Sequence, residues 1–215
     1  ESYHNFHYCS LITGSLINRE DLKDRLNEES LEKLLNRLDS CVRATAKLYG
    51  GQRVEGDEST LHLCMRSNDC SKQHLLICLM LTYSLQQLVK QLSSRLSIKI
   101  EMTWILLGKK IASTPIFSFH EDMAQLKKSS LDQAAKLNNE MIAIQTSEFS
   151  IDELSTIARF NHLEENCFSL KAFPIERQEL LNRQIAHLYH ACFAAEINSP
   201  SARVPQDSSS QCNEI

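Results

Sequence analysis

LYGGQRVEGDESTLHLCM, residues 48–65, is the stretch of this sequence that decides its fold class. Gly50 and Gly51 end a helical pattern, because glycine tolerates the left-handed backbone that commonly follows a helix. Residues 52–55 and 59–65 then have strand-like composition, and the turn-forming pair Gly56-Asp57 joins them. The stretch therefore predicts a helix that leads directly into a β-hairpin.

Upstream of this stretch, the pattern predicts one strand and two helices. Residues 6–13 (FHYCSLIT) are strand-like, and Gly14-Ser15 closes the run. Asn18 is expected to cap a short helix over residues 19–26. A longer helix should then run to about Leu48, because apolar residues recur at three- and four-residue steps at Leu31, Leu34, Leu35, Leu38 and Val42.

Downstream of the hairpin, helical and strand-like patterns alternate. Helices are predicted at residues 72–96 and 121–138, after Ser150 and after Pro174, and strands at 98–106, 141–146 and 167–173. Ser150 and Glu153 have the spacing of a capping box. This order indicates one mixed α/β domain over residues 1–196, and the polar composition of residues 197–215 predicts a disordered tail.

Composition and charge narrow the class of protein. The 215 residues carry a formal net charge of −4, which gives no general electrostatic attraction to nucleic acid, and we expect no nucleic-acid partner. The eight cysteines contain no C-x-x-C pair and are expected to be free thiols in a reducing, cytoplasmic compartment. Polar residues interrupt the apolar run 75–89, which predicts a core helix, and a membrane tether outside this sequence stays open as an alternative.

Three short motifs resemble those of class III adenylate and guanylate cyclases. The helix ending in Leu48-Tyr49-Gly50-Gly51, followed by Gly56-Asp57 and a strand, resembles the central signature of that family. Residues 11–15 (LITGS) stand where the family has D-I-x-G-F, and residues 131–136 (LDQAAK) stand where it has V-N-x-A-A-R. The resemblance spans residues 6–173 and implies a ferredoxin-like α/β sandwich, with a sheet covered by helices on one main face.

The resemblance also implies that much of the catalytic machinery is missing. Class III cyclases hold two divalent metals with two aspartates, whereas here Leu11 occupies one of these positions and leaves Asp57 as the remaining metal-ligand candidate. Asp132 replaces the asparagine that orients the ribose, and Lys136 replaces the arginine that stabilises charge in the transition state, usually across a dimer interface. No clear match to the base-recognition lysine is present in residues 52–55. Asp57, Asp132 and Lys136 are thus vestigial catalytic candidates, and no cofactor is expected.

We therefore expect a catalytically inactive, cyclase-like signalling module that forms a homodimer or binds another signalling protein. The alternative is a divergent cyclase, or a nucleotide-sensing domain, that needs a complementary subunit and uses Asp57 with Glu55 or Asp132 as carboxylates. A divalent metal would bind only in that alternative.

Simpler interpretations of the same residues remain open at this point. Asp57 can be a hairpin-turn residue, and Asp132 and Lys136 can form an ion pair on a helix surface. Two stretches with His-x-x-His-x-Cys spacing, at residues 4–9 and 187–192, suggest a zinc site. The apolar patterns around Cys9 and Cys192 instead favour ordinary core cysteines.

Overall fold

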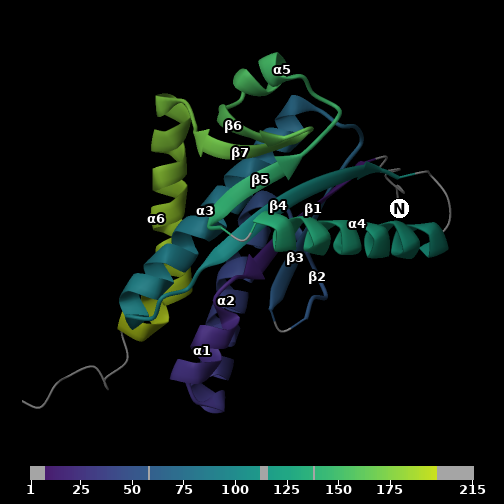
Figure 1. Cartoon of the computed structure of the whole chain (residues 1–215). Coiled ribbons are helices and arrows are strands. Elements are labelled where there is room, and N and C mark those ends of the chain that lie inside the picture. Colours follow the sequence, from purple (N-terminus) through teal and green to yellow (C-terminus); the bar gives the residue numbers. More distant parts are fainter. Residues whose placement is uncertain (1–7, 58, 112–115, 138, 198–215) are drawn as a thin grey trace, which may run out of the picture.

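The computed structural model describes residues 8–57, 59–111, 116–137 and 139–197, and for residues 116–119 and 194–197 it describes the backbone alone. These residues form seven strands and six helices (Figure 1). The strands are β1 (Tyr8–Leu16), β2 (Gln52–Val54), β3 (Thr60–Ser67), β4 (Met102–Lys110), β5 (Met141–Gln145), β6 (Arg159–Glu164) and β7 (Cys167–Ala172). The helices are α1 (Arg19–Arg25), α2 (Glu28–Tyr49), α3 (Lys72–Leu96), α4 (Ile116–Leu137), α5 (Ile151–Ser155) and α6 (Ile175–Ile197).

All seven strands belong to one mixed sheet in the order β2-β3-β1-β4-β5-β7-β6. β1 is an interior strand and pairs antiparallel with both β3 and β4. β4 and β5 are parallel, and α4 connects them, as a parallel pair requires a crossover. The predicted mixed α/β sandwich is confirmed.

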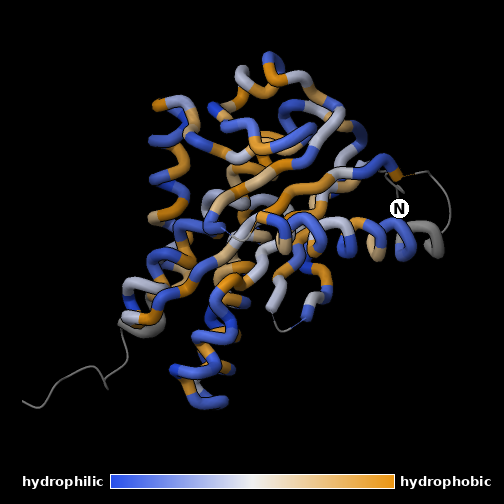
Figure 2. Tube along the Cα trace, in the orientation of Figure 1, coloured by the Kyte–Doolittle hydropathy of each residue, from blue (hydrophilic) through white to orange (hydrophobic). Residues whose placement is uncertain are grey.

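Helices cover the two faces of the sheet unequally. α1, α2, α3 and α6 contribute to the larger hydrophobic cluster on one face, whereas α4 crosses the opposite face (Figure 1). Figure 2 shows that α1 and the start of α2 are mostly hydrophilic, while β4 and β5 are largely hydrophobic along their length. Strands that are buried on both faces are expected to show this continuous apolar pattern.

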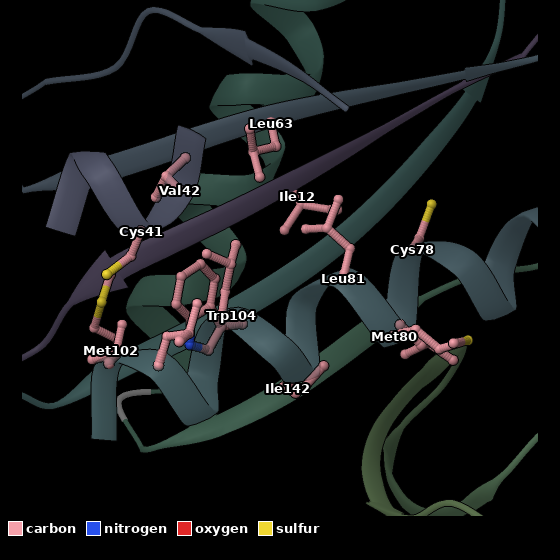
Figure 3. Packing of buried hydrophobic residues seen from close by; sticks show 14 of the residues in the cluster. Ile12, Cys41, Val42, Leu63, Cys78, Met80, Leu81, Met102, Trp104 and Ile142 are labelled. Carbon is pink, nitrogen blue, oxygen red and sulfur yellow. The ribbon is translucent and has the colours of Figure 1, made fainter. Parts of the chain in front are cut away.

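Trp104 of β4 organises the larger cluster. Its side chain lies among those of Ile12, Met102 and Ile142 (Figure 3) and is almost completely buried. The indole packs directly on Gly14 of β1, where an added Cβ would lie 2.5 Å from the ring. The glycine that closes the predicted first strand therefore has a packing role, because it admits the indole to the sheet surface.

α3 lies in the interior. Its length and hydropathy would suit a membrane span, but side chains such as Leu79, Leu81, Leu85, Leu88 and Leu92 are fully buried against the rest of the chain. The predicted core helix is confirmed with the same bounds, residues 72–96.

Several local predictions are also confirmed. α2 ends at Tyr49, with Gly50 in the left-handed conformation at φ 79°, as the Gly50-Gly51 pair predicts. The capping box at Ser150 and Glu153 is present with both hydrogen bonds. Residues 198–215, which make up nearly all of the predicted tail, lie outside the described residues.

Other local predictions are wrong. β6 was not predicted, because its side chains are mostly exposed and polar and lack an apolar alternation. β4 begins at Met102, four residues later than predicted, because Ser97 has a left-handed backbone and the Ser93 hydroxyl binds the Ile98 carbonyl in an intervening turn. α4 begins at Ile116, five residues earlier than predicted.

Asn18 does not cap α1 with its side chain. Its Nδ2 instead donates to the Lys99 carbonyl at 2.7 Å, and its Oδ1 accepts from the Glu101 amide at 3.0 Å. Asn18 thus ties the end of β1 to the segment that leads into β4, a long-range role that local helix signals do not reveal.

Candidate functional site

The tip of the β2–β3 hairpin holds Asp57. Its Oδ1 accepts hydrogen bonds from the Ser59 amide at 2.8 Å, the Ser59 hydroxyl at 3.1 Å and the Thr60 hydroxyl at 2.9 Å. Partial burial acts to raise the pKa of Asp57, but the hydrogen bonds from Ser59 and Thr60 outweigh it, and the net pKa is lowered. An added Cβ on Gly56 would lie 2.4 Å from the Thr60 carbonyl oxygen. The Gly-Asp pair is therefore accounted for by the turn itself.

Leu11, which the motif resemblance places at the position of the family's first aspartate, lies in β1, an interior strand of the sheet. It pairs with Cys64 of β3 and Leu107 of β4, and its side chain is 0% exposed. It belongs to the smaller cluster beneath α4, together with Cys9, Cys64, Ile105, Leu107, Met123, Leu126, Ala134, Ala143 and Cys167. The Leu11 side chain offers no oxygen ligand to a hydrated cation. Moving this side chain aside to admit a cation would expose the apolar core to water.

A polar pair, Thr13 and His62, lies beside Leu11 on the same face of the sheet. Thr13 Oγ1 and His62 Nδ1 share a hydrogen bond of 2.9 Å, and both residues are buried. Burial, then the nearby Lys127 ammonium, lowers the pKa of His62 to about 4, although the Asp57 carboxylate acts against this shift. His62 is therefore a neutral, structural histidine near pH 7.

α4 is tied to the hairpin by Lys127, whose Nζ donates to the Glu55 carbonyl at 2.6 Å. The Glu55 side chain is exposed, so it does not supply a carboxylate within the buried cluster. Neither His62 nor Lys127 was selected from the sequence. The alternation of Thr60, His62 and Cys64 along the strand was a signal that could have placed His62 on the same face as Cys64.

Asp132 and Lys136 lie on the outer face of α4 and are exposed. The intervening Gln133 and Ala134 face the sheet, and Gln133 Nε2 donates to Glu164 Oε1 at 3.0 Å. Within the part of the chain that the structure describes, Asp132 and Lys136 form no ion pair with each other, and neither forms a hydrogen bond or ion pair with Asp57. A single chain therefore does not assemble the three vestigial candidates into one site.

The residues present do not fit the two-metal centre that the resemblance implies. One carboxylate position holds buried Leu11, and the carboxylate at the other is engaged by its own turn. Among the described residues, no group of three or more His, Cys, Asp and Glu side chains is arranged to hold a metal ion.

The zinc site suggested by the His-x-x-His-x-Cys spacing at residues 4–9 and 187–192 is not assembled among the described residues. His187 and His190 are exposed on α6, whereas the half-buried Cys192 packs against the larger cluster. Cys9 is buried beside Cys64, and residues 4 and 7 of the first stretch lie outside the described residues. The His and Cys residues of the second stretch thus face different surroundings.

One surface pocket lies apart from the positions that the motifs indicate. It has a volume of about 440 Å³ between the starts of α3 and α6 and is lined by Lys72, Thr156, Arg177 and neighbouring residues. Leu11 and Asp57 do not line it, so it is separate from the positions that the motifs indicate.

Comparison with solved structures identifies the architecture. No protein-family model and no curated protein sequence matches the chain. The guanylyl cyclase domain of the RhoGC fusion protein from Blastocladiella emersonii is similar with a TM-score of 0.56 and 12% identity, over 79% of this chain and 97% of that one. The adenylyl cyclase CyaB from P. aeruginosa is similar with a TM-score of 0.57 and 11% identity, over 79% and 96% of the two chains. The guanylyl cyclase Cya2 is similar with a TM-score of 0.54 and 12% identity, over 78% and 93%.

Proposed function

We propose that this chain, which has the fold of a class III nucleotide cyclase catalytic domain, is a catalytically inactive regulatory or dimerisation module in cytoplasmic signalling. The observation that carries the proposal is Leu11, fully buried beneath α4 where the resemblance places the first metal-binding aspartate. Two-metal catalysis requires carboxylates on both sides of the metal pair, and this position supplies an isobutyl group. We expect no resident cofactor.

The outer face of α4 is the surface that we propose for self-association. Leu131 is 37% exposed there, and the exposed side chains of Asp132, Ala135 and Lys136 surround it. The acidic and basic residues stand one helical turn apart, so two copies of α4 that pack antiparallel can place each Asp132 opposite the Lys136 of the other copy. Such a two-fold pairing is self-complementary and closed.

Support for a homodimer comes from this charge arrangement and from the relatives. A RhoGC guanylyl cyclase domain is described as dimeric, and a second structure of that domain is described as monomeric. The same fold is therefore seen in both states, and the state of this chain has to depend on its own surface residues.

The cytoplasmic assignment rests on the cysteines, because all seven that lie in the described residues are free thiols.

Sedimentation velocity of the chain over a range of concentrations tests the proposed dimer. The wild type should associate, Lys136→Glu should weaken association by placing like charges opposite each other, and the exchange Asp132→Lys with Lys136→Asp should restore it. Arg183→Glu, an equally exposed charge reversal on α6, is the matched control and should have no effect. A wild type that stays monomeric, or an exchange that fails to restore association, would contradict the α4 interface.

An activity assay tests the catalytic part of the proposal. The chain is incubated with ATP or GTP and manganese, alone and mixed with an active class III cyclase domain, and cyclic product is measured. We expect no product from the chain alone and no increase over the active domain in the mixture. Product formation would instead support the alternative of a divergent cyclase with a complementary subunit, whereas calorimetric binding of nucleotide without product would support a nucleotide sensor.

A further inference from the structure

Two cysteines from adjacent strands meet beneath α4. Cys9 of β1 is 1% exposed, Cys64 of β3 is 2% exposed, and their sulfur atoms are 2.8 Å apart. In the strand register Cys9 pairs with Arg66 while Cys64 pairs with Leu11, so the two thiols are diagonal neighbours on one face of the sheet. This contact has no part in the proposed function.

The two thiols have different chemical characters. The hydrogen bond with Cys9 lowers the pKa of Cys64, burial opposes this shift, and the nearby Arg66 guanidinium lowers the pKa further. The same hydrogen bond, followed by burial, raises the pKa of Cys9. Cys64 is therefore the thiol that ionises first, with Cys9 donating its S–H, and a thiolate is the nucleophilic form of cysteine.

Cys9 and Cys64 lie close to the edge of the sheet face that α4 covers. Arg66 follows Cys64 on the same face of β3 and is exposed, and β2 ends its pairing at Gln52 opposite Cys64. A small molecule therefore needs only a local opening of the rim, and not the displacement of the whole helix, to reach the sulfur of Cys64.

We propose that Cys9 and Cys64 form a redox-active dithiol, which a hydroperoxide converts to a disulfide between β1 and β3. The Cys64 thiolate attacks one peroxide oxygen, the O–O bond breaks, and the other oxygen leaves and is protonated, which gives a sulfenic acid on Cys64. The Cys9 sulfur then attacks the Cys64 sulfur, the S–O bond breaks, and water leaves with the Cys9 proton. Overall the two thiols lose two electrons and two protons, and the hydroperoxide is reduced to water and a second water or an alcohol.

The geometry requires a modest change. The sulfurs must approach by about 0.8 Å to reach a disulfide bond length. The bond would close a loop that contains α1, α2 and β2, and a cross-link over such a long loop restricts the unfolded chain strongly. The oxidised protein should therefore unfold at a temperature several degrees higher than the reduced protein.

Peptide mapping of the wild-type protein tests the inference directly. The chain is treated with hydrogen peroxide, free thiols are alkylated after unfolding, and digested peptides are analysed by mass spectrometry. We expect a linked Cys9–Cys64 peptide that dithiothreitol removes, together with the rise in unfolding temperature. Recovery of both cysteines as alkylated thiols, conversion of Cys64 to sulfinic or sulfonic acid without a link, or a link from either residue to Cys70 or Cys78 would overturn the proposal.

Two variants sharpen the test. In Cys64→Ser, Cys9 should be recovered as a thiol after peroxide, and the rise in unfolding temperature should be lost. Cys167→Ser is the matched control, because Cys167 is 1% exposed in the same cluster but lies on β7. This variant should form the Cys9–Cys64 link to the same extent as the wild type.

Discussion

Substitution of Leu11 by aspartate should strongly destabilise the protein at neutral pH, although aspartate is the residue that the resemblance expects at this position. Truncating a buried leucine costs about 2–5 kcal/mol through lost burial and the cavity that remains. A carboxylate left uncompensated in such a site adds about 3–5 kcal/mol, because Leu11 is 0% exposed within an apolar cluster. The sum is comparable with the whole stability of a typical domain, about 5–15 kcal/mol.

The pH dependence of this variant separates the charge from the cavity. Burial raises the folded-state pKa of the new carboxyl above its unfolded value, so between the two values the folded state binds more protons than the unfolded state. Stability should then fall as pH rises through this range, by about 1.4 kcal/mol per pH unit. Leu11→Asn, which has a similar shape and no charge, should be destabilised without that slope.

Urea unfolding followed by circular dichroism at pH 5 and pH 7.5 measures all of these quantities. Leu11→Asp should have a lower midpoint than Leu11→Asn at pH 7.5, and the two should approach each other at pH 5. Manganese should not recover the loss. A Leu11→Asp variant as stable as the wild type at pH 7.5, or one that manganese stabilises, would refute the conclusion that this position is closed core.

Three further changes test the fold around the site. Acidification should destabilise the protein as pH falls from about 6.5 to about 4, because the pKa of His62 is lowered to about 4 in the folded state, so that the unfolded state binds more protons. His62 should contribute up to about 3 kcal/mol to this loss of unfolding free energy, and His62→Gln should remove that contribution, as urea unfolding at each pH would measure. Gly14→Ala should lower the urea midpoint and change the near-ultraviolet dichroism of Trp104, since the added Cβ would lie 2.5 Å from its ring; an unchanged spectrum would contradict this packing. Asn18→Ala should cost about 1–3 kcal/mol by removing two long-range hydrogen bonds, and Asn18→Ser, a good helix cap, should fail to restore it if capping is not the role of this residue.

The candidate site was predictable from the sequence only in part. The order of Leu11, Asp57, Asp132 and Lys136 along the chain was sufficient to identify a resemblance, and the fold comparisons agree with it. The interpretation of Asp57 as a turn residue also follows from local chemistry, since its partners are two and three residues away. The burial of Leu11 and the contacts of His62 and Lys127 could not be read from the sequence, because each depends on α4 packing across strands that are distant in the chain.

By itself the sequence determined the elements whose signals are local. The bounds of α3, the glycine that ends α2 and the capping box of α5 follow from apolar periodicity and from hydrogen bonds that span three or four residues. Only the tertiary structure decided that β1 lies between β3 and β4, that α4 covers Leu11, and that Cys9 meets Cys64 across 55 residues of chain. Strand pairing and helix packing are set by the burial of surfaces contributed from the whole chain, and a local pattern carries no information about which distant surface will cover it.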